Sequence, residues 1–394
     1  MMLTLERSTY RGTRRRANGT KRWKGPREKA VLEQLLGEAD VRVDGDRPWD
    51  ITVKKQDFFR RVLAGGSLAL GESYMDGWWE CGQLDEFIHR VLRAELKDKV
   101  ISWKDRLGVV QAKLMNKQSL GRAFQVGKEH YDKGNDLFEA MLDERMIYSC
   151  GYWKEADTLE QAQVAKLELV CKKLDIRPGM RVLDIGCGWG GTARYIAERY
   201  KAEVTGVTVS EEQASLARQN TEGLSVEIRL QDYRKLEGSF DRILSIGMFE
   251  HVGYKNYRMY MQTVRRLLRK KGLFLLHTIG GNLWSANIDP WIERYIFPNA
   301  NLPSISQISA AFEGLFVMED WHNFGPDYDK TLMEWFKRFD SHWSSLRKRY
   351  DQRFYRMWKY YLLSCAGAFR ARHTQLWQVV LSPTGIYRSY QGPR

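Results

Sequence analysis

The stretch Arg181-Val-Leu-Asp-Ile-Gly-Cys-Gly-Trp-Gly-Gly191 decides how this chain folds. Its first five residues follow a turn at Pro178–Gly179 and predict a buried strand. The glycines after the strand let the chain turn sharply and let its backbone approach a ligand closely. Residues 191–200 then predict a helix, which completes a strand–loop–helix unit. In this context the glycines indicate a binding loop at the carboxyl edge of a parallel sheet; a tight turn that binds nothing is the alternative.

Strands and helices alternate around this unit, which is typical of a parallel sheet covered on both faces. We therefore expect an α/β chain with a doubly wound, Rossmann-like domain and helical insertions late in the sequence. The expected strands are 181–185, 203–208, 225–229, 240–246, 272–277 and 377–381, and the expected helices are 191–200, 211–220, 257–268, 331–346 and 353–370.

The chain before this domain predicts a small, mostly helical unit. Apolar residues recur at helical spacing along residues 84–96. Trp78 and Trp79 fit a protein core better than an exposed apolar anchor. The expected organisation is a basic arm at 1–30, a helical domain at 31–115, a linker at 116–127 and the α/β domain at 128–394.

Charge is concentrated at the start of the chain. The 394 residues carry a formal net charge of +14, and residues 1–30 hold ten Lys/Arg against two Glu, a net +8. Such an arm suits nucleic acid or anionic lipid headgroups, and its alternative is a solvated tail. Charge alone does not choose between these partners.

Other classes are excluded by composition. Five cysteines without paired zinc-type spacing predict neither a disulfide framework nor a Cys-based metal site, and no metal is expected. No apolar stretch approaches the roughly 18 to 20 residues of a membrane-spanning helix, and no signal-peptide pattern follows the basic start. We expect a cytoplasmic protein whose membrane contact is peripheral.

The residue that ends the first strand indicates the ligand. Asp184 directly precedes the glycines, a pattern typical of S-adenosylmethionine methyltransferases. An NAD enzyme would also place an acidic residue at the end of the second strand, where this chain has the sequence Gly206–Ser210. A carboxylate near the loop suits a cofactor that carries a sulfonium and an amino-acid end.

Several unusual strings, in one order, resemble the cyclopropane-fatty-acyl-phospholipid synthases over roughly residues 50 to 381. The N-terminal strings FFRRVL and GESYMDGWWE resemble the bacterial phospholipid enzymes specifically. The strings are FFRRVL (58–63), GESYMDGWWE (71–80), HYDKGNDLF (130–138), YSCGYW (148–153), LDIGCGWGG (183–191), GMFEHVG (247–253), HTIG (277–280), NFGPDYDKTL (323–332) and CAGAFRAR (365–372).

The resemblance implies a reaction and two small molecules. The family adds the methyl of S-adenosylmethionine to a cis double bond of a phospholipid acyl chain and closes a cyclopropane ring after proton loss, with bound bicarbonate as general base. Bicarbonate contacts are implied at Cys150, Glu250, His277, Ile279 and Tyr328, and Cys365 matches the family's active-site cysteine. Cofactor contacts are implied at Tyr148, Ser149, Leu183, Asp184, Ile185, Gly186, Cys187, Gly188, Trp189, Gly190, Gly191, Thr208, Val209, Ser210, Glu211, Glu212, Gln213, Gln231 and Asp232.

The site residues have structural alternatives. Glu250 and His251 are expected to end the fourth strand, where α/β sheets bind ligands. His277 is as compatible with a hydrogen-bonded structural role, and Tyr328 with a core position. Cys150 and Cys365 also fit small buried apolar positions, and direct methyl transfer needs no covalent enzyme intermediate. We expect Cys365 to line the pocket.

Three other functions remain open at this point. A related methyltransferase could make methyl-branched acyl chains or methylate a small molecule, although the first domain resembles the phospholipid enzymes. An RNA methyltransferase lacks support, because no RNA-binding module and no NPPY-type motif are present. The third is a non-enzymatic lipid-binding protein. The expected partners are phospholipid with unsaturated acyl chains, an anionic membrane surface contacted by the small domain, and a second copy in a homodimer, without nucleic acid.

Overall fold

The computed structural model describes residues 25–95, 134–285, 287–387 and 390–394. Most of the predicted basic arm at 1–30, the linker at 116–127 and the first residues of the α/β domain lie outside the described residues.

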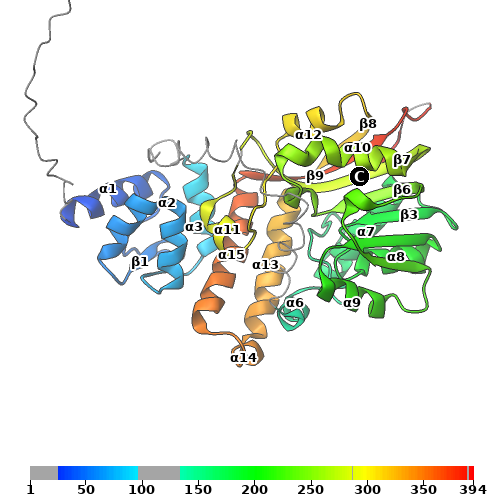
Figure 1. The fold of residues 1–394 in the computed structure, drawn as a ribbon. Coiled ribbons are helices and arrows are strands. Elements are labelled where there is room, and N and C mark those ends of the chain that lie inside the picture. The colour runs from blue at the N-terminus through cyan, green and yellow to red at the C-terminus, as the bar shows by residue number, and fades with distance from the viewer. Residues whose placement is uncertain (1–24, 96–133, 286, 388–389) are drawn as a thin grey trace, which may run out of the picture.

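A seven-stranded sheet forms the centre of the α/β part, in the order β5-β4-β3-β6-β7-β9-β8 (Figure 1). Its first five strands are parallel, whereas β9 is antiparallel to both of its neighbours. The predicted fold class is confirmed. The strands are β3 (Arg181–Ile185), β4 (Glu203–Thr208), β5 (Val226–Leu230), β6 (Phe240–Ile246), β7 (Leu268–Gly281), β8 (Val317–Asn323) and β9 (Thr374–Ser382).

Successive residues of the central strands pack against helices on opposite faces of the sheet. Leu183 of β3 joins the cluster that contains α10 (Tyr257–Leu267) and α12 (Ile305–Phe312). Val182 joins the cluster of α7 (Leu159–Lys173) and α8 (Gly191–Tyr200). The apolar run of β3 is therefore buried on both faces, as the sequence predicted. A further helix, α9 (Glu211–Asn220), follows β4.

Two features of the sheet differ from the prediction. The strand β8 was not predicted, because it lies at the sheet edge and its sequence, VMEDWHN, is mostly polar and largely exposed. The strand β7 runs to Gly281, beyond the predicted end at His277, because its last residues pair with β9 as far as Gly281–Thr374. Glu250 and His251 do not end a strand; they lie in the 3-10 turn η3 (Phe249–His251) after β6.

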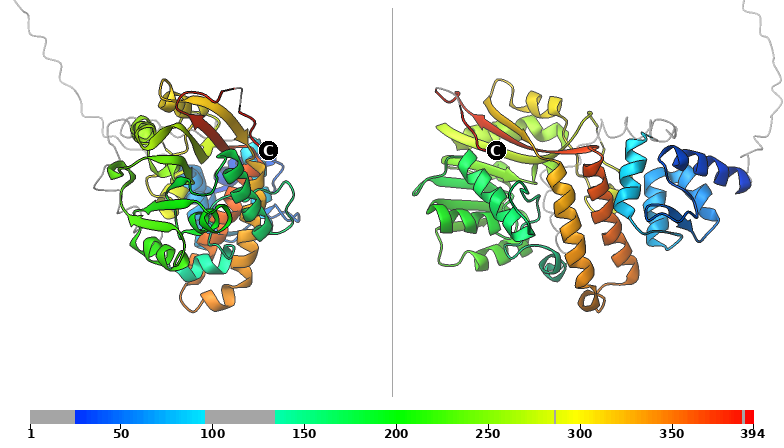
Figure 2. Two further views of the ribbon diagram at one scale, coloured as in Figure 1. Left: turned by 90° about the vertical axis from the view of Figure 1, so that its right-hand side faces the viewer. Right: turned by 180° about the vertical axis from the view of Figure 1, so that it is seen from behind.

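The predicted late helices form a layer between the sheet and the N-terminal helices, as Figures 1 and 2 show. The predicted segment 331–346 divides into α13 (Pro326–Ser341) and α14 (Trp343–Leu346), because the first helix begins earlier, at Pro326. The second predicted helix is α15 (Gln352–Arg370), which packs against α2 and α3. Two short helices, α6 (Asn135–Met141) and α11 (Pro290–Tyr295), complete this layer.

The described N-terminal part is mostly helical, as predicted. It contains α1 (Gly25–Glu38), α2 (Asp57–Met75), α3 (Leu84–Arg93) and a hairpin of β1 (Ile51–Val53) and β2 (Trp79–Cys81). Trp79 is fully buried, which confirms its predicted core position. The half-buried Trp78 lies beneath Lys55 and Arg61. One hydrophobic cluster runs from Trp79 through α15 to Trp189 of the glycine loop, so this part shares its core with the binding loop.

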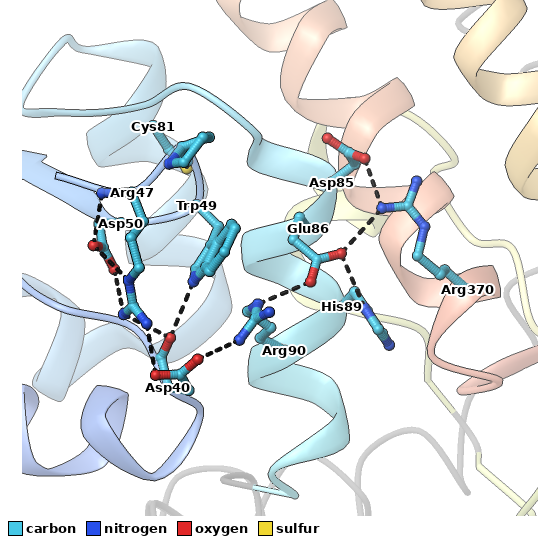
Figure 3. Close-up of polar contacts among 11 residues, drawn as sticks. Asp40, Arg47, Trp49, Asp50, Cys81, Asp85, Glu86, His89, Arg90 and Arg370 are labelled. Atoms are coloured by element: carbon cyan, nitrogen blue, oxygen red, sulfur yellow. Dashed lines mark hydrogen bonds and ion pairs between the residues drawn. The ribbon is translucent and has the colours of Figure 1, made fainter. Parts of the chain in front are cut away.

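A chain of ion pairs also joins the N-terminal part to the late helices (Figure 3). Arg370 of α15 pairs with Asp85 of α3 at 2.7 Å and with Asp329 of α13 at 2.9 Å. Glu86 of α3 contacts the same guanidinium at 3.3 Å and also pairs with Arg90. Because Asp329 directly follows Tyr328, these contacts hold α3 close to one of the predicted site residues.

Candidate functional site

A cavity lies at the carboxyl edge of β3, β4 and β6, where the glycine loop follows β3. All but four of the residues predicted to contact the cofactor line it. The lining residues from the prediction are Tyr148, Ser149, Asp184, Ile185, Gly186, Cys187, Gly188, Trp189, Gly191, Thr208, Val209, Ser210, Gln213, Gln231 and Asp232.

Four predicted cofactor residues lie outside the lining, each for a structural reason. Leu183 is fully buried against α10 and α12. Gly190 caps α8 and packs on Ala217. Glu211 and Glu212 are exposed in the first turn of α9.

Two glycines show why the loop needs this residue type. Gly188 has φ +54°, and a Cβ built there would meet no protein atom within 4 Å. A side chain at this position would therefore occupy the cavity itself. Gly191, at the start of α8, lies directly under the carbonyl oxygen of Arg145, so that a Cβ would collide with the backbone. Gly188 therefore leaves room for a ligand, and Gly191 allows α8 to pack closely against the backbone at Arg145.

A buried lysine lies below the cavity and was not predicted as a site residue. Lys166 of α7 is fully buried, and its Nζ donates a hydrogen bond to Ser149 Oγ over 3.1 Å. Burial lowers the pKa of Lys166 to about 8, against the opposing attraction of Asp143 and other nearby groups. Burial also raises the pKa of Asp184 to about 7, and Lys166 counteracts that rise. The lysine therefore favours the charged form of the Asp184 carboxylate.

The cavity lining also includes polar side chains held in place by hydrogen bonds. Asp232 accepts hydrogen bonds from the backbone and the side chain of Arg234, at 2.9 and 2.8 Å. Thr208 Oγ1 donates to Gln213 Oε1 over 2.9 Å. A cavity lined by glycines, by two buried carboxylates (Asp184 and Asp232) and by both polar and apolar side chains fits S-adenosylmethionine. Sequence reasoning missed further lining residues. Gly247, Met248 and Val252 lie in the string GMFEHVG, which could have pointed to them, whereas the others carry no motif: Met146, Ile147, Thr192, Val207, Tyr233, Arg234 and Ile246.

The turn η3 directs His251 and Glu250, which are adjacent in sequence, to different surroundings. His251 lines the cofactor cavity, and burial lowers its pKa to about 4, so its imidazole is neutral. Glu250 is outside that lining and is buried elsewhere. Its Oε1 accepts a hydrogen bond from the backbone N–H of Ile279 over 2.6 Å, and its Oε2 is buried with no hydrogen-bond partner among the described residues. Burial raises the pKa of Glu250 to about 7.

His277 presents a second buried polar atom of the opposite kind. Its Nδ1 accepts a hydrogen bond from Gln378 Nε2 over 3.2 Å, which leaves the ring proton on Nε2. The Nε2 atom is buried, and no residue in the described part of the chain hydrogen-bonds to it. Burial holds the pKa of His277 well below its usual range, so the ring is a neutral donor. Phe324 packs edge-on against the ring.

Tyr328 of α13 brings the remaining predicted residues together. It is buried, stacked on Phe369, and its hydroxyl lies within electrostatic range of Glu250, Cys150 and Cys365. Burial raises the pKa of Cys365 to about 12 and that of Cys150 well above its usual range. Both thiols are therefore protonated at neutral pH, and neither cysteine is among the residues that line the cofactor cavity.

Glu250 is bound by Ile279, two residues after His277 in β7, and the two side chains offer complementary polar atoms to a small oxyanion that carries a proton. Glu250 Oε2 is a buried acceptor and His277 Nε2 is a buried donor, and each costs free energy while it lacks a partner. Bicarbonate has both a hydroxyl and acceptor oxygens.

Comparison with known proteins shows the family. The sequence pattern of the mycolic acid cyclopropane synthetase family matches residues 118–379. The cyclopropane-fatty-acyl-phospholipid synthase of Escherichia coli K12 is 58% identical over 353 residues, which cover 89% of this chain and 92% of that protein. Cyclopropane mycolic acid synthase 1 of Mycobacterium tuberculosis is 35% identical over 260 residues, covering 61% of this chain and 91% of that protein.

Solved structures agree with this assignment. The mycolic acid cyclopropane synthase CmaA1, complexed with SAH and CTAB, superposes with a TM-score of 0.61 at 31% identity. The alignment covers 66% of this chain and 97% of that chain. Coclaurine N-methyltransferase, bound to N-methylheliamine and SAH, gives a TM-score of 0.67 at 24% identity, covering 79% of this chain and 98% of that chain, and shares the fold.

Proposed function

The chain belongs to the mycolic acid cyclopropane synthetase family, and on that premise we propose that it converts cis double bonds of phospholipid acyl chains into cyclopropane rings. It is an S-adenosylmethionine-dependent methyltransferase of the cyclopropane synthase type. The observation that supports a phospholipid substrate is how much of this chain aligns with the phospholipid enzyme. That match spans 89% of this chain and therefore reaches into the N-terminal part, whereas the mycolic acid enzymes match 61 to 64% of it.

The cofactor contributes an electrophilic methyl group when bound, and the chain's own residues position and shield it. Asp184, assisted by Lys166, supplies negative charge at the loop, and Gly188 leaves the space for the ligand. The buried aromatic residues around Tyr328 keep water away from a developing positive charge on the acyl chain. Gln378 Nε2 occupies the lone pair of the neutral His277 ring at Nδ1, and the two protonated thiols are weaker nucleophiles towards that charge than thiolates would be.

Proton removal is the step that needs the second cluster. Glu250 and His277 would hold a bicarbonate ion, with Tyr328, Ile279 and Cys150 around it, and the ion would supply a general base. The two unpartnered buried atoms of the cluster support this assignment. A hydrogen-bonded anion in a pocket from which water is excluded stabilises nearby positive charge better than bulk solvent does.

The proposal also includes the surroundings of the enzyme. It acts as a homodimer on the cytoplasmic face of the cell membrane, which it contacts peripherally, with attraction from the basic residues of the arm. Among the described residues, no helix is long and apolar enough to span a bilayer.

Analysis of the lipid product tests the function. Purified protein is incubated with S-adenosylmethionine and vesicles of a monounsaturated phospholipid, and the acyl chains are analysed by mass and by alkene content. A gain of one CH₂ with loss of the alkene is the expected product. A gain of one CH₂ with the alkene retained would identify the alternative, a methyltransferase that makes methyl-branched chains.

A further inference from the structure

The most exposed apolar side chains near the site lie on the loop of residues 282–285. Leu283 is 82% exposed and Trp284 is 46% exposed. Ile305, which is 54% exposed, follows Ser304, and Ser304 pairs with Gly281 in a bridge. None of the large exposed apolar residues falls in the described N-terminal segment 27–95. Among the described residues, the side chains of this loop are therefore the best candidates for an apolar contact with lipid.

The backbone of the 282–285 loop is fixed although its side chains are exposed. Asn282 Nδ2 donates to the carbonyl oxygen of Arg372 over 2.8 Å, and Asn301 Nδ2 donates to the carbonyl oxygen of Ser285 over 3.0 Å. The indole of Trp284 lies edge-on to the ring of Tyr254, at 6.1 Å between centroids. The loop thus presents its apolar side chains from a rigid support, which lowers the entropic cost of inserting them into another phase.

The same loop is connected to Glu250 through the chain and through a hydrogen bond. It follows β7, whose Ile279 binds the Glu250 carboxylate. Asn301, which holds the loop through its side chain, also donates its backbone N–H to the carbonyl oxygen of Glu250 over 2.8 Å. An acyl chain lifted from a bilayer at this loop would begin its path beside the predicted site of reaction.

Basic residues flank the apolar side chains. Lys255 follows Tyr254, the residue that contacts Trp284, and it is exposed. Arg372, whose carbonyl anchors the loop, is also exposed. Tryptophan and leucine beside basic groups suit the boundary between anionic headgroups and acyl chains.

We propose that the 282–285 loop, with Ile305 beside it, inserts into the headgroup–acyl boundary of an anionic bilayer. This inference rests on the proposed function, because it names the surface through which the phospholipid substrate is reached. The occupant is the bilayer, rather than a second copy of the chain or one of its own segments.

Vesicle binding of the double variant Leu283→Ser/Trp284→Ser tests the proposal. The control is Val317→Ser/Met318→Ser, whose side chains are 46% and 48% exposed. Met318 pairs with Leu381, which pairs with Phe274 early in β7, so the control lies at the opposite edge of the sheet. With vesicles of phosphatidylglycerol and phosphatidylethanolamine, the loop variant should bind about tenfold more weakly, because two apolar side chains no longer leave water. The control should bind like the unchanged protein.

Two further measurements identify the occupant. Phospholipids brominated on the acyl chain should quench the tryptophan fluorescence of the unchanged protein, and Trp284→Phe should remove most of that quenching. For vesicle lipid the loop variant should show a raised KM with kcat retained, and its affinity for S-adenosylhomocysteine should be unchanged.

Equal vesicle binding by the loop variant and the unchanged protein would overturn the proposal. So would a changed oligomeric mass or a lowered unfolding temperature without weaker vesicle binding, because the loop would then cover a second copy or another segment of the chain. Vesicle binding can be measured by sedimentation, which does not depend on catalytic turnover. An unchanged protein that binds vesicles through Trp284 yet forms no cyclopropane would therefore refute the proposed function and leave this inference standing.

Discussion

The backbone N–H of Ile279 donates a hydrogen bond to one carboxylate oxygen of Glu250 over 2.6 Å, and the other oxygen is buried with no hydrogen-bond partner in the part of the chain that the structure describes. The contact joins the turn after β6 to the end of β7, so it exists only in the folded sheet. It orients the carboxylate but leaves its second oxygen available. A protein that buries a carboxylate oxygen without a partner loses stability at that position, and this cost is the physical basis of the proposal that Glu250 contacts a bound anion.

Replacing this carboxylate by its neutral isostere should stabilise the protein without ligand. Burial holds the pKa of Glu250 at about 7, above its ordinary 4.5, so the folded state binds the proton more tightly than the unfolded state. The group therefore costs stability as the pH rises from about 4.5 to about 7. Glu250→Gln should be more stable than the unchanged protein by about 2 to 3 kcal/mol at pH 8, and about equally stable at pH 4.

Urea unfolding at both pH values measures this difference. Glu222→Gln is the matched control, because Glu222 is an exposed glutamate away from the cluster. A Glu250→Gln protein that gains no stability over the control between pH 4 and pH 8 would show that the carboxylate has a partner in solution.

A side chain at Gly188 should remove cofactor binding. A Cβ there meets no protein atom, so a valine side chain would occupy the cavity that the ligand needs. Gly179 provides a matched control, because it also has a positive φ, of +76°, with open space around its Cβ, and it is not among the lining residues. Both valine variants carry the same kind of backbone strain, of about 1 to 2 kcal/mol.

Calorimetry with S-adenosylhomocysteine should detect no binding to Gly188→Val and ordinary binding to Gly179→Val. Circular dichroism confirms that both are folded. Ordinary affinity in folded Gly188→Val protein would mean that the ligand does not use the space beside this loop.

The sequence carried most of the fold because the buried strands are short apolar runs between turn residues. The strand β3 is buried on both faces of the sheet, with Leu183 and Ile185 packed on one face and Val182 on the other. A continuous apolar run predicts this arrangement. The edge strand β8 has no such run, because water rather than protein faces most of its side chains.

The site was predictable in part. The glycines and Asp184 mark the cofactor loop through local geometry, and the structure places most of them around one cavity. The Glu250–Ile279 contact joins residues 29 apart in the chain, and only the family resemblance pointed to it. Lys166 was missed because a lysine within a helix is ordinarily expected to face solvent. Its burial depends on how α7 packs against the rest of the protein, which the local sequence does not show.

Loss of the buried lysine should change the pH dependence of cofactor binding. Burial raises the pKa of Asp184 to about 7 even though the charge of Lys166 lowers it. In Lys166→Met that opposing charge is gone, so Asp184 should ionise only at higher pH. The affinity for S-adenosylmethionine, which favours the ionised carboxylate, should then reach its maximum at a higher pH than in the unchanged protein.

Titration calorimetry between pH 6 and pH 9 measures the profile, and Lys166→Arg should restore part of it by restoring the charge. Ser149 would also lose its donor, which predicts a weaker affinity at every pH. A uniform loss of affinity with an unmoved pH profile would assign Lys166 to packing and to Ser149 alone, without an effect on Asp184.

Removal of the Glu250 carboxylate should slow turnover much more than it weakens cofactor binding, because Glu250 lies outside the cavity lining whereas His251 lies within it. Glu250→Ala should lower kcat by roughly 10² to 10⁴, the usual contribution of an acid–base group, while calorimetry shows nearly ordinary affinity for S-adenosylhomocysteine. If the group acts through a bound anion, carbonate-free buffer should lower the activity of the unchanged protein, and added bicarbonate should restore it. The residual activity of Glu250→Ala should respond little to bicarbonate, and Glu222→Ala should respond as the unchanged protein does. Normal turnover by Glu250→Ala, or full activity in an unchanged protein shown to have lost its carbonate, would require a protein side chain as the base.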